Sequence, residues 1–104
     1  MRGYFSMILH AHLPYVRHPE YEEFLEEDWL YEAISETYIP LLNMFENLTK
    51  DKIPWNITMT MSGTLANMLN DELLRSRYEV SLNKSLELCR LEVERLKDQE
   101  ELLN

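Results

Sequence analysis

Two histidines spaced two residues apart, His10 and His12, are the side chains of this sequence best suited to chemistry. They close an apolar run, residues 3–9, whose single polar residue is Ser6. Such a run is typical of a strand covered on both faces, as in a parallel sheet flanked by helices, and Pro14 should end it. Residues two apart on a strand share a face, so we expect both rings to point the same way, with Cα atoms roughly 7 Å apart.

A histidine pair of this kind allows three interpretations. As metal ligands, the imidazoles would need one or two further donors, for which only His18, the acidic loop after it and Asp71 are available. As hydrogen-bonding groups, they could hold a polyhydroxylated substrate, with Tyr15, Trp29 or Trp55 offering aromatic faces to sugar rings. In the structural interpretation, one histidine is a core residue and the other lies on the surface.

Other common catalytic signatures do not occur in this sequence. The two glycines, Gly3 and Gly63, are isolated, so there is no glycine-rich phosphate loop. No nucleophile elbow or Cys-His pair can be drawn either.

The composition limits the classes of partner. The chain has 104 residues, of which 45% are hydrophobic and 28% charged, as in a soluble globular domain. A net charge of -9 argues against nucleic acid or a membrane surface as partner. The single Cys89 occupies an apolar helical position, which predicts a buried free thiol, a reducing compartment and a cytoplasmic location. Neither a signal peptide nor a run of about 18 apolar residues is present.

The first half of the chain reads as a strand, a long loop and a helix. Residues 15–27 form the loop, and its five glutamates predict a solvated face. Loops of this length often belong to binding sites. Asp28 is the predicted N-cap of an amphipathic helix that extends to about Leu48. Pro40 lies inside the apolar pattern and predicts a kink, or a second helix with this proline in its first turn.

The second half repeats the order of strand and helix. The alternation in residues 55–61 predicts the second strand, and Ser62 or Thr64 is the expected cap of a short helix after it. From Asp71 to Asn104 an apolar stripe predicts a helix of some 30 residues. We favour a packed crossover helix over a coiled coil, because the stripe is wide and irregular.

This order predicts the opening of a β/α fold, in which active sites lie at the carboxyl ends of parallel strands. His10 and His12 occupy one such end, and Ser62 and Thr64 another. Two strands cannot close a sheet, so we expect residues 1–104 to be a fragment of a longer chain.

Several stretches of the sequence are similar to the N-terminus of glycoside hydrolase family 57, especially its branching-enzyme and α-amylase-like members. They are HAHLPYVRHP at residues 10–19, WLYEA at 29–33, YIPLL at 38–42 and ITMTMSGTL at 57–65. The resemblance covers nearly the whole chain. It departs from the family at Ser62-Gly63, where many relatives have a proline in the turn.

The resemblance implies an enzyme that acts on α-1,4-glucans with an incomplete, seven-stranded TIM-like β/α barrel. It implies a retaining double displacement by a glutamate nucleophile and an aspartate acid/base on later strands, without a metal or other cofactor. No catalytic residue would then lie in residues 1–104, so this segment alone should be inactive. His10 and His12 would bind the substrate, and the partners would be the α-glucan and the remainder of the same barrel.

Three questions stay open from the sequence. Transfer of the glycosyl unit to a glucan hydroxyl would give branching, and transfer to water would give hydrolysis. A metal-dependent amidohydrolase-type barrel also opens with His-x-His and would use His10 and His12 as ligands. A non-catalytic alternative is a helical interaction module built on residues 71–104.

Overall fold

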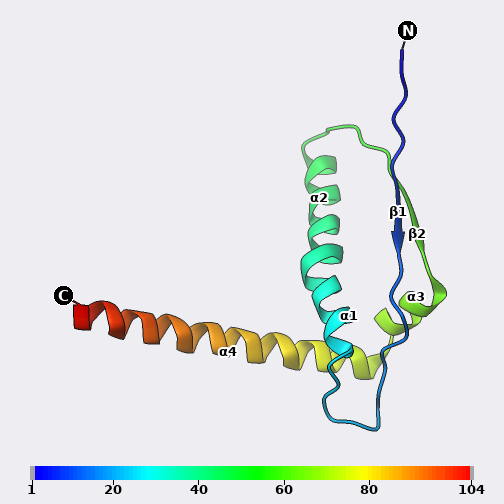
Figure 1. Cartoon of the computed structure of the whole chain (residues 1–104). Helices are drawn as coiled ribbons and strands as arrows, with labels where there is room; N and C mark the ends of the chain where they lie inside the picture. Colours follow the sequence, from blue (N-terminus) through cyan, green and yellow to red (C-terminus); the bar gives the residue numbers. More distant parts are fainter. Residues whose placement is uncertain (1, 104) are drawn as a thin grey trace. The chain divides into compact units, whose positions relative to one another are not determined.

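The structure is a computed structural model that describes residues 2–103, in two compact units divided after Asp71. Its elements are β1 (Ile8–Ala11), α1 (Glu27–Ala33), the π-helical segment η1 (Ile34–Tyr38), α2 (Ile39–Lys50), β2 (Thr58–Met61), α3 (Gly63–Leu69) and α4 (Glu72–Leu103) (Figure 1). The first unit holds everything except α4. This is the predicted mixed α/β order of strand, loop, helix, strand and helix.

The two strands lie side by side and parallel, with His10 opposite Thr60 and Ala11 opposite Met61 (Figure 1). Because parallel strands need a crossover, the chain passes through α1, η1 and α2 between them. The first strand is shorter than predicted, since it begins at Ile8. The expectation of two covered faces is wrong for this chain: Ala11 is the one buried residue in the two strands.

The apolar core lies beyond the strand ends rather than on the faces of the sheet. Its members in the first unit come from the end of β1, the loop after it, α1 and α3: Ala11, Val16, Leu30, Tyr31, Leu65 and Met68. Two four-residue strands offer little area for helices to cover. The loop and the short helix that follow the strands bury more apolar surface, and they are therefore fixed next to the strand ends.

One helical stretch runs through α1, η1 and α2, and Pro40 explains its change of pitch. Proline has no backbone N–H, and its ring crowds the carbonyl four residues earlier, which belongs to Glu36. The helix widens over Ile34–Tyr38, and the N–H of Ile39 donates to the carbonyl of Ile34, five residues back. Pro40 then lies in the first turn of α2, which is the position that one of the two predicted alternatives gave it.

The predicted N-cap at Asp28 is wrong. The helix begins at Glu27 with Glu26 as its N-cap, and no side chain caps it. Tight turns before the helix supply the acceptors for its first N–H groups instead. The backbone N–H groups of Glu27, Asp28 and Trp29 donate to carbonyls three residues earlier, at 3.0, 3.1 and 3.2 Å.

The C-terminus of α2 ends in a Schellman motif. The residue in the left-handed position of this motif is Lys52, where glycine is usual. The N–H of Ile53 donates to the carbonyl of Leu48 (2.9 Å) and that of Lys52 to Thr49 (3.1 Å). Lys52 has a φ of 57°, the left-handed region in which a Cβ is disfavoured.

Replacing Lys52 with glycine should therefore stabilise the protein by about 0.5–1 kcal/mol, because relief of the left-handed strain exceeds the extra chain entropy that glycine loses. Chemical denaturation of the full-length protein would measure the change. The matched control is Lys50→Gly, inside the last turn of α2. It should destabilise by about 1 kcal/mol. A loss of stability in both variants would show that Lys52 is not strained by its left-handed backbone.

The second unit consists of α4, which confirms the predicted helix of some 30 residues with its 32 residues. Cys89 is exposed, so the prediction of a buried thiol is wrong. Ion pairs Arg90–Glu87 and Arg95–Glu92 lie along the helix, and the bond from Arg95 lowers the pKa of the Glu92 carboxyl. No helix in residues 2–103 has the length and apolarity that a membrane crossing requires.

Candidate functional site

The two strands place His10 and His12 on one face at the carboxyl end of the sheet. His10 is the third residue of β1, and His12 directly follows the strand. The ring centroids lie 6.0 Å apart with an interplanar angle of 27°. The prediction that the rings share a face is confirmed, and both side chains are exposed.

Each histidine is hydrogen-bonded to a hydroxyl on the neighbouring strand or just beyond it. His10 Nδ1 lies 2.5 Å from Thr60 Oγ1, and His12 Nδ1 lies 2.7 Å from Ser62 Oγ. The register explains the pairing, because Thr60 is opposite His10 and Ser62 is two residues further, on the same face. The backbone N–H of Ser62 also donates to the carbonyl of Ala11 (3.0 Å), which extends the strand pairing to this point.

Ser62 has a second structural task as the N-cap of α3. Its backbone is extended, and its Oγ accepts from the N–H of Leu65 at 3.2 Å. Of the two predicted caps, Ser62 is confirmed, and Thr64 lies in the first turn of the helix. One hydroxyl therefore joins the start of α3 to the imidazole of His12.

This arrangement fixes two imidazole rings and commits one nitrogen of each to a protein hydroxyl. A neutral imidazole can donate through one nitrogen and accept through the other. With Nδ1 engaged, Nε2 of each ring is the atom left to meet a ligand. Two such nitrogens on adjacent, aligned rings suit neighbouring hydroxyls of a sugar ring, which both donate and accept hydrogen bonds.

The metal interpretation of the pair has no support in residues 2–103, where no three His, Cys, Asp or Glu side chains are grouped as ligands. The donors considered from the sequence are engaged elsewhere. His18 Nδ1 lies 3.0 Å from Glu20 Oε1, and Arg17 Nε lies 2.9 Å from Asp71 Oδ2.

The acidic loop is closed at its base by Glu27. The carboxylate of Glu27 accepts from the backbone N–H of His18 (3.4 Å) and from the hydroxyl of Tyr31 (2.9 Å). Glu27 is only 1% exposed, so the prediction that all five loop glutamates are solvated is wrong for this residue. The position four residues before Tyr31, at the start of α1, turns this side chain into the protein.

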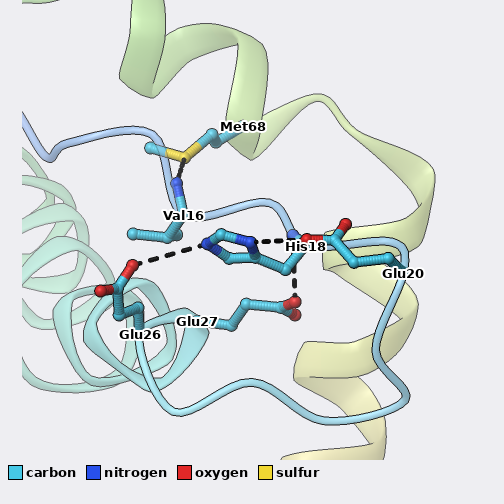
Figure 2. A network of polar contacts seen from close by, with 6 residues as sticks. All are labelled: Val16, His18, Glu20, Glu26, Glu27 and Met68. Atoms are coloured by element: carbon cyan, nitrogen blue, oxygen red, sulfur yellow. Dashed lines mark hydrogen bonds and ion pairs between the residues drawn. The ribbon is translucent and has the colours of Figure 1, made fainter.

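Other side chains of the loop, including His18, Glu20 and Glu26, lie next to Glu27 (Figure 2). The imidazole of His18 lies between the carboxylates of Glu20 and Glu26, with its Nε2 3.5 Å from Glu26 Oε2. Its ring packs on Phe24 at a centroid distance of 3.7 Å, and Tyr21 stacks on the same Phe24 at 5.3 Å. Residues 18–27 are thus a compact loop with neighbouring ends, as in an Ω-loop.

A sulfur contact fixes the segment that leads from His12 into this loop. The buried N–H of Val16 donates to Sδ of Met68 in α3, at 3.4 Å (Figure 2). Both side chains are buried, at 0% and 1% exposure. The segment after β1 is therefore tied to α3 twice, through His12 to the cap of the helix and through Val16 to its last turn.

The three aromatic residues considered as sugar platforms differ in their surroundings. Trp55 is stacked on Phe45 of α2 with centroids 4.6 Å apart, and its Nε1 donates to Thr49 at 3.1 Å. This is a structural role. Tyr15 and Trp29 are 60% and 49% exposed, so both side chains are accessible to a ligand.

Sequence reasoning missed the hydroxyl partners of the histidines and the buried carboxylate. A signal for the hydroxyls was present, because Thr58, Thr60 and Ser62 alternate with apolar residues as His10 and His12 do. It could be used only once the strands were known to be neighbours in this register. For Glu27, the spacing from Tyr31 was visible, but similar glutamates precede it.

Comparison with known proteins shows the family of the chain. Residues 6–104 match the family model described as Glycosyl hydrolase family 57. The chain is 42% identical over 86 residues to the 1,4-alpha-glucan branching enzyme of Thermococcus kodakarensis, which covers 83% of this chain and 13% of that protein. It is 32% identical over 69 residues to a Mycobacterium tuberculosis protein named probable 1,4-alpha-glucan branching enzyme, covering 66% and 13%.

A solved structure is also similar to this chain in its fold. The crystal structure of the novel alpha-amylase AmyC from Thermotoga maritima superposes with a TM-score of 0.81 at 50% identity, over 91% of this chain and 18% of that one. The chain spans about an eighth of the length of the two curated relatives. Because the family model matches nearly the whole of this chain, the chain belongs to glycosyl hydrolase family 57.

Proposed function

We propose that residues 1–104 form the N-terminal part of the catalytic barrel of an enzyme that acts on α-1,4-glucans, with His10 and His12 binding the substrate. The observation that carries this proposal is the histidine pair at the carboxyl end of two parallel strands, each ring fixed by a hydroxyl. Relatives named as branching enzymes and an alpha-amylase support the substrate class.

The barrel in this proposal is the incomplete, seven-stranded form, to which β1 and β2 contribute the first two strands. Both catalytic carboxyl groups then come from the remainder of the barrel, so this segment alone is inactive. A retaining reaction needs these groups about 5–5.5 Å apart and an oxocarbenium-like transition state. No cofactor enters the reaction, and the enzyme works in the cytoplasm.

The chemical task of the histidines follows from their free nitrogens. Nε2 of His10 and of His12 would form hydrogen bonds to hydroxyls of the sugar unit under attack. Bonds that hold the sugar ring in the distorted shape of the transition state are strongest in that state, and they therefore favour it over the bound substrate. The fixed rings need no reorganisation at that moment.

Branching and hydrolysis are distinguished by the products of the full-length protein. Incubation with amylose should yield new α-1,6 branch points if the glycosyl unit passes to a glucan hydroxyl. It should yield reducing ends without branch points if the unit passes to water. We expect branching, because the curated relatives carry that name. Absence of both products under conditions where the protein is folded would contradict the proposed function.

Metal removal should leave the activity nearly intact. No third ligand stands beside the two histidines among the described residues. Exhaustive chelation of the full-length enzyme, followed by assay on amylose, would test this. A loss of activity that zinc restores would instead favour the amidohydrolase-type site.

A further inference from the structure

The hydroxyl of Ser62 has one hydrogen and two lone pairs, and its neighbours limit how they are used. One lone pair accepts the N–H of Leu65 at 3.2 Å. The remaining short contact, 2.7 Å to His12 Nδ1, can have either direction of donation. An oxygen that already accepts a hydrogen bond is polarised and becomes a better donor. The cap bond therefore favours donation from Ser62 to the imidazole.

We propose that Ser62 is a positioning residue that donates to Nδ1 of His12 and so holds the proton of the neutral ring on Nε2. This inference rests on the proposed function and names what the fixed ring offers, which is an N–H donor directed to a sugar oxygen. Thr60 Oγ1 makes the corresponding contact to Nδ1 of His10, at 2.5 Å. The tautomer of His12 is thus set by the hydroxyl at the start of α3.

The geometry explains why these hydroxyls have this role. Ser62 is held by its backbone bond to Ala11 and by its place at the start of α3, so its Oγ has a fixed position. Leu65 and Met68 bury α3 in the core, which prevents the cap from moving. The ring of His12 is exposed, and the contact to Ser62 limits its rotation.

Three replacements of Ser62 separate its effect on His12 from its effect on the helix. Ser62→Thr keeps a hydroxyl that can cap and donate. Ser62→Ala loses both bonds. Ser62→Asp keeps a good cap, but its carboxylate only accepts, so it would draw the proton of His12 to Nδ1.

In the full-length enzyme, we expect Ser62→Ala and Ser62→Asp to lower kcat on amylose about five- to tenfold, with KM little changed. Ser62→Thr should restore most of that loss. The melting temperature should fall in Ser62→Ala only, since Ser62→Asp retains the cap. If Ser62→Asp keeps full turnover, or if turnover follows the melting temperature across the three variants, Ser62 acts only as a cap and the inference is overturned.

Nitrogen-15 NMR of histidine-labelled protein tests the tautomer without any assay of activity. We expect Nε2 of His12 to carry the proton in the parent protein, and Nδ1 to carry it or to share it in Ser62→Asp. The resonances are assigned with a His12→Gln variant. A parent protein with the proton on Nδ1 would contradict the inference even if the enzyme is active. The expected tautomer in a protein that does not turn over glucans would contradict the proposed function instead.

Two valine substitutions on β2 test whether the hydroxyl of Thr60 matters to His10. Thr60→Val removes the hydroxyl opposite His10 without a change of shape. Thr58→Val makes the same change two residues earlier, opposite Ile8. We expect Thr60→Val to lower kcat severalfold and Thr58→Val to leave it unchanged. Equal effects of the two variants would show that strand propensity, and not the contact with His10, is responsible.

Discussion

Replacement of His10 by alanine in the full-length enzyme is expected to lower kcat on an α-glucan ten- to a hundredfold. The imidazole would contact the sugar unit under attack, and its hydrogen bond matters most when the sugar ring takes the distorted shape of the transition state. A hydrogen bond to a charged group is worth about 1.5–3 kcal/mol, which corresponds to this range of rates. Because the bond belongs mainly to the transition state, kcat should fall more than KM rises. Initial rates over a range of amylose concentrations would separate the two.

Stability distinguishes this role from a structural one. His10 is exposed, and its Nδ1 contacts the exposed hydroxyl of Thr60 rather than the core. The melting temperature should therefore barely change. Thr58→Val, on the neighbouring strand, should match the parent protein in both rate and stability. If the His10→Ala variant unfolds early while its folded fraction keeps normal turnover, His10 is a core histidine and not a substrate ligand.

Replacement of Glu27 by alanine should have the opposite signature, a large loss of stability. The buried carboxylate accepts from the hydroxyl of Tyr31 and the backbone N–H of His18, and both donors would lose this acceptor. Removal of a buried carboxylate that accepts from two donors breaks a buried hydrogen-bond network, so we expect the free energy of unfolding to fall by about 2–4 kcal/mol. Denaturant unfolding of the full-length protein would measure this change.

Local opening should accompany the loss of stability in the Glu27→Ala variant. The contact between His18 and Glu27 closes the base of the loop of residues 18–27, so amide hydrogen exchange and proteolysis should accelerate there. Glu22→Ala is the matched control, because Glu22 lies in the same loop and is exposed. Its effect on stability should stay within about 0.5 kcal/mol. Equal, small effects of the two variants would show that the carboxylate of Glu27 does not anchor the loop.

The sequence by itself determined the elements and the position of the histidine pair. A continuous apolar run predicted the first strand, and a two-residue period of apolar residues predicted the second. The 3.6-residue period predicted the helices between and after them, including the long helix α4. Spacing along one strand was enough to place His10 and His12 on one face, because alternation is a property of the extended backbone. Pro40 and Ser62 were also predicted correctly, since their effects act within a few residues of the chain.

The predictions that were wrong depended on contacts that residue type and periodicity do not show. Glu27 looks like the other loop glutamates, and its burial arises from the fold of the loop back onto α1. Cys89 lies at an apolar position of α4, but periodicity does not show whether another surface covers it. Asp28 is a good capping residue by type, but the preceding turn already supplied the acceptors for the first N–H groups.

Only the tertiary structure decided which hydroxyls fix the histidines. Thr60 and Ser62 are fifty residues away from His10 and His12 along the chain. Their pairing depends on the register of two parallel strands, and a shift by one residue would turn every side chain of one strand to the other face. Local sequence specifies that a strand forms, whereas the register is set by the crossover helices and by the core around Leu65 and Met68 that holds α3 in place.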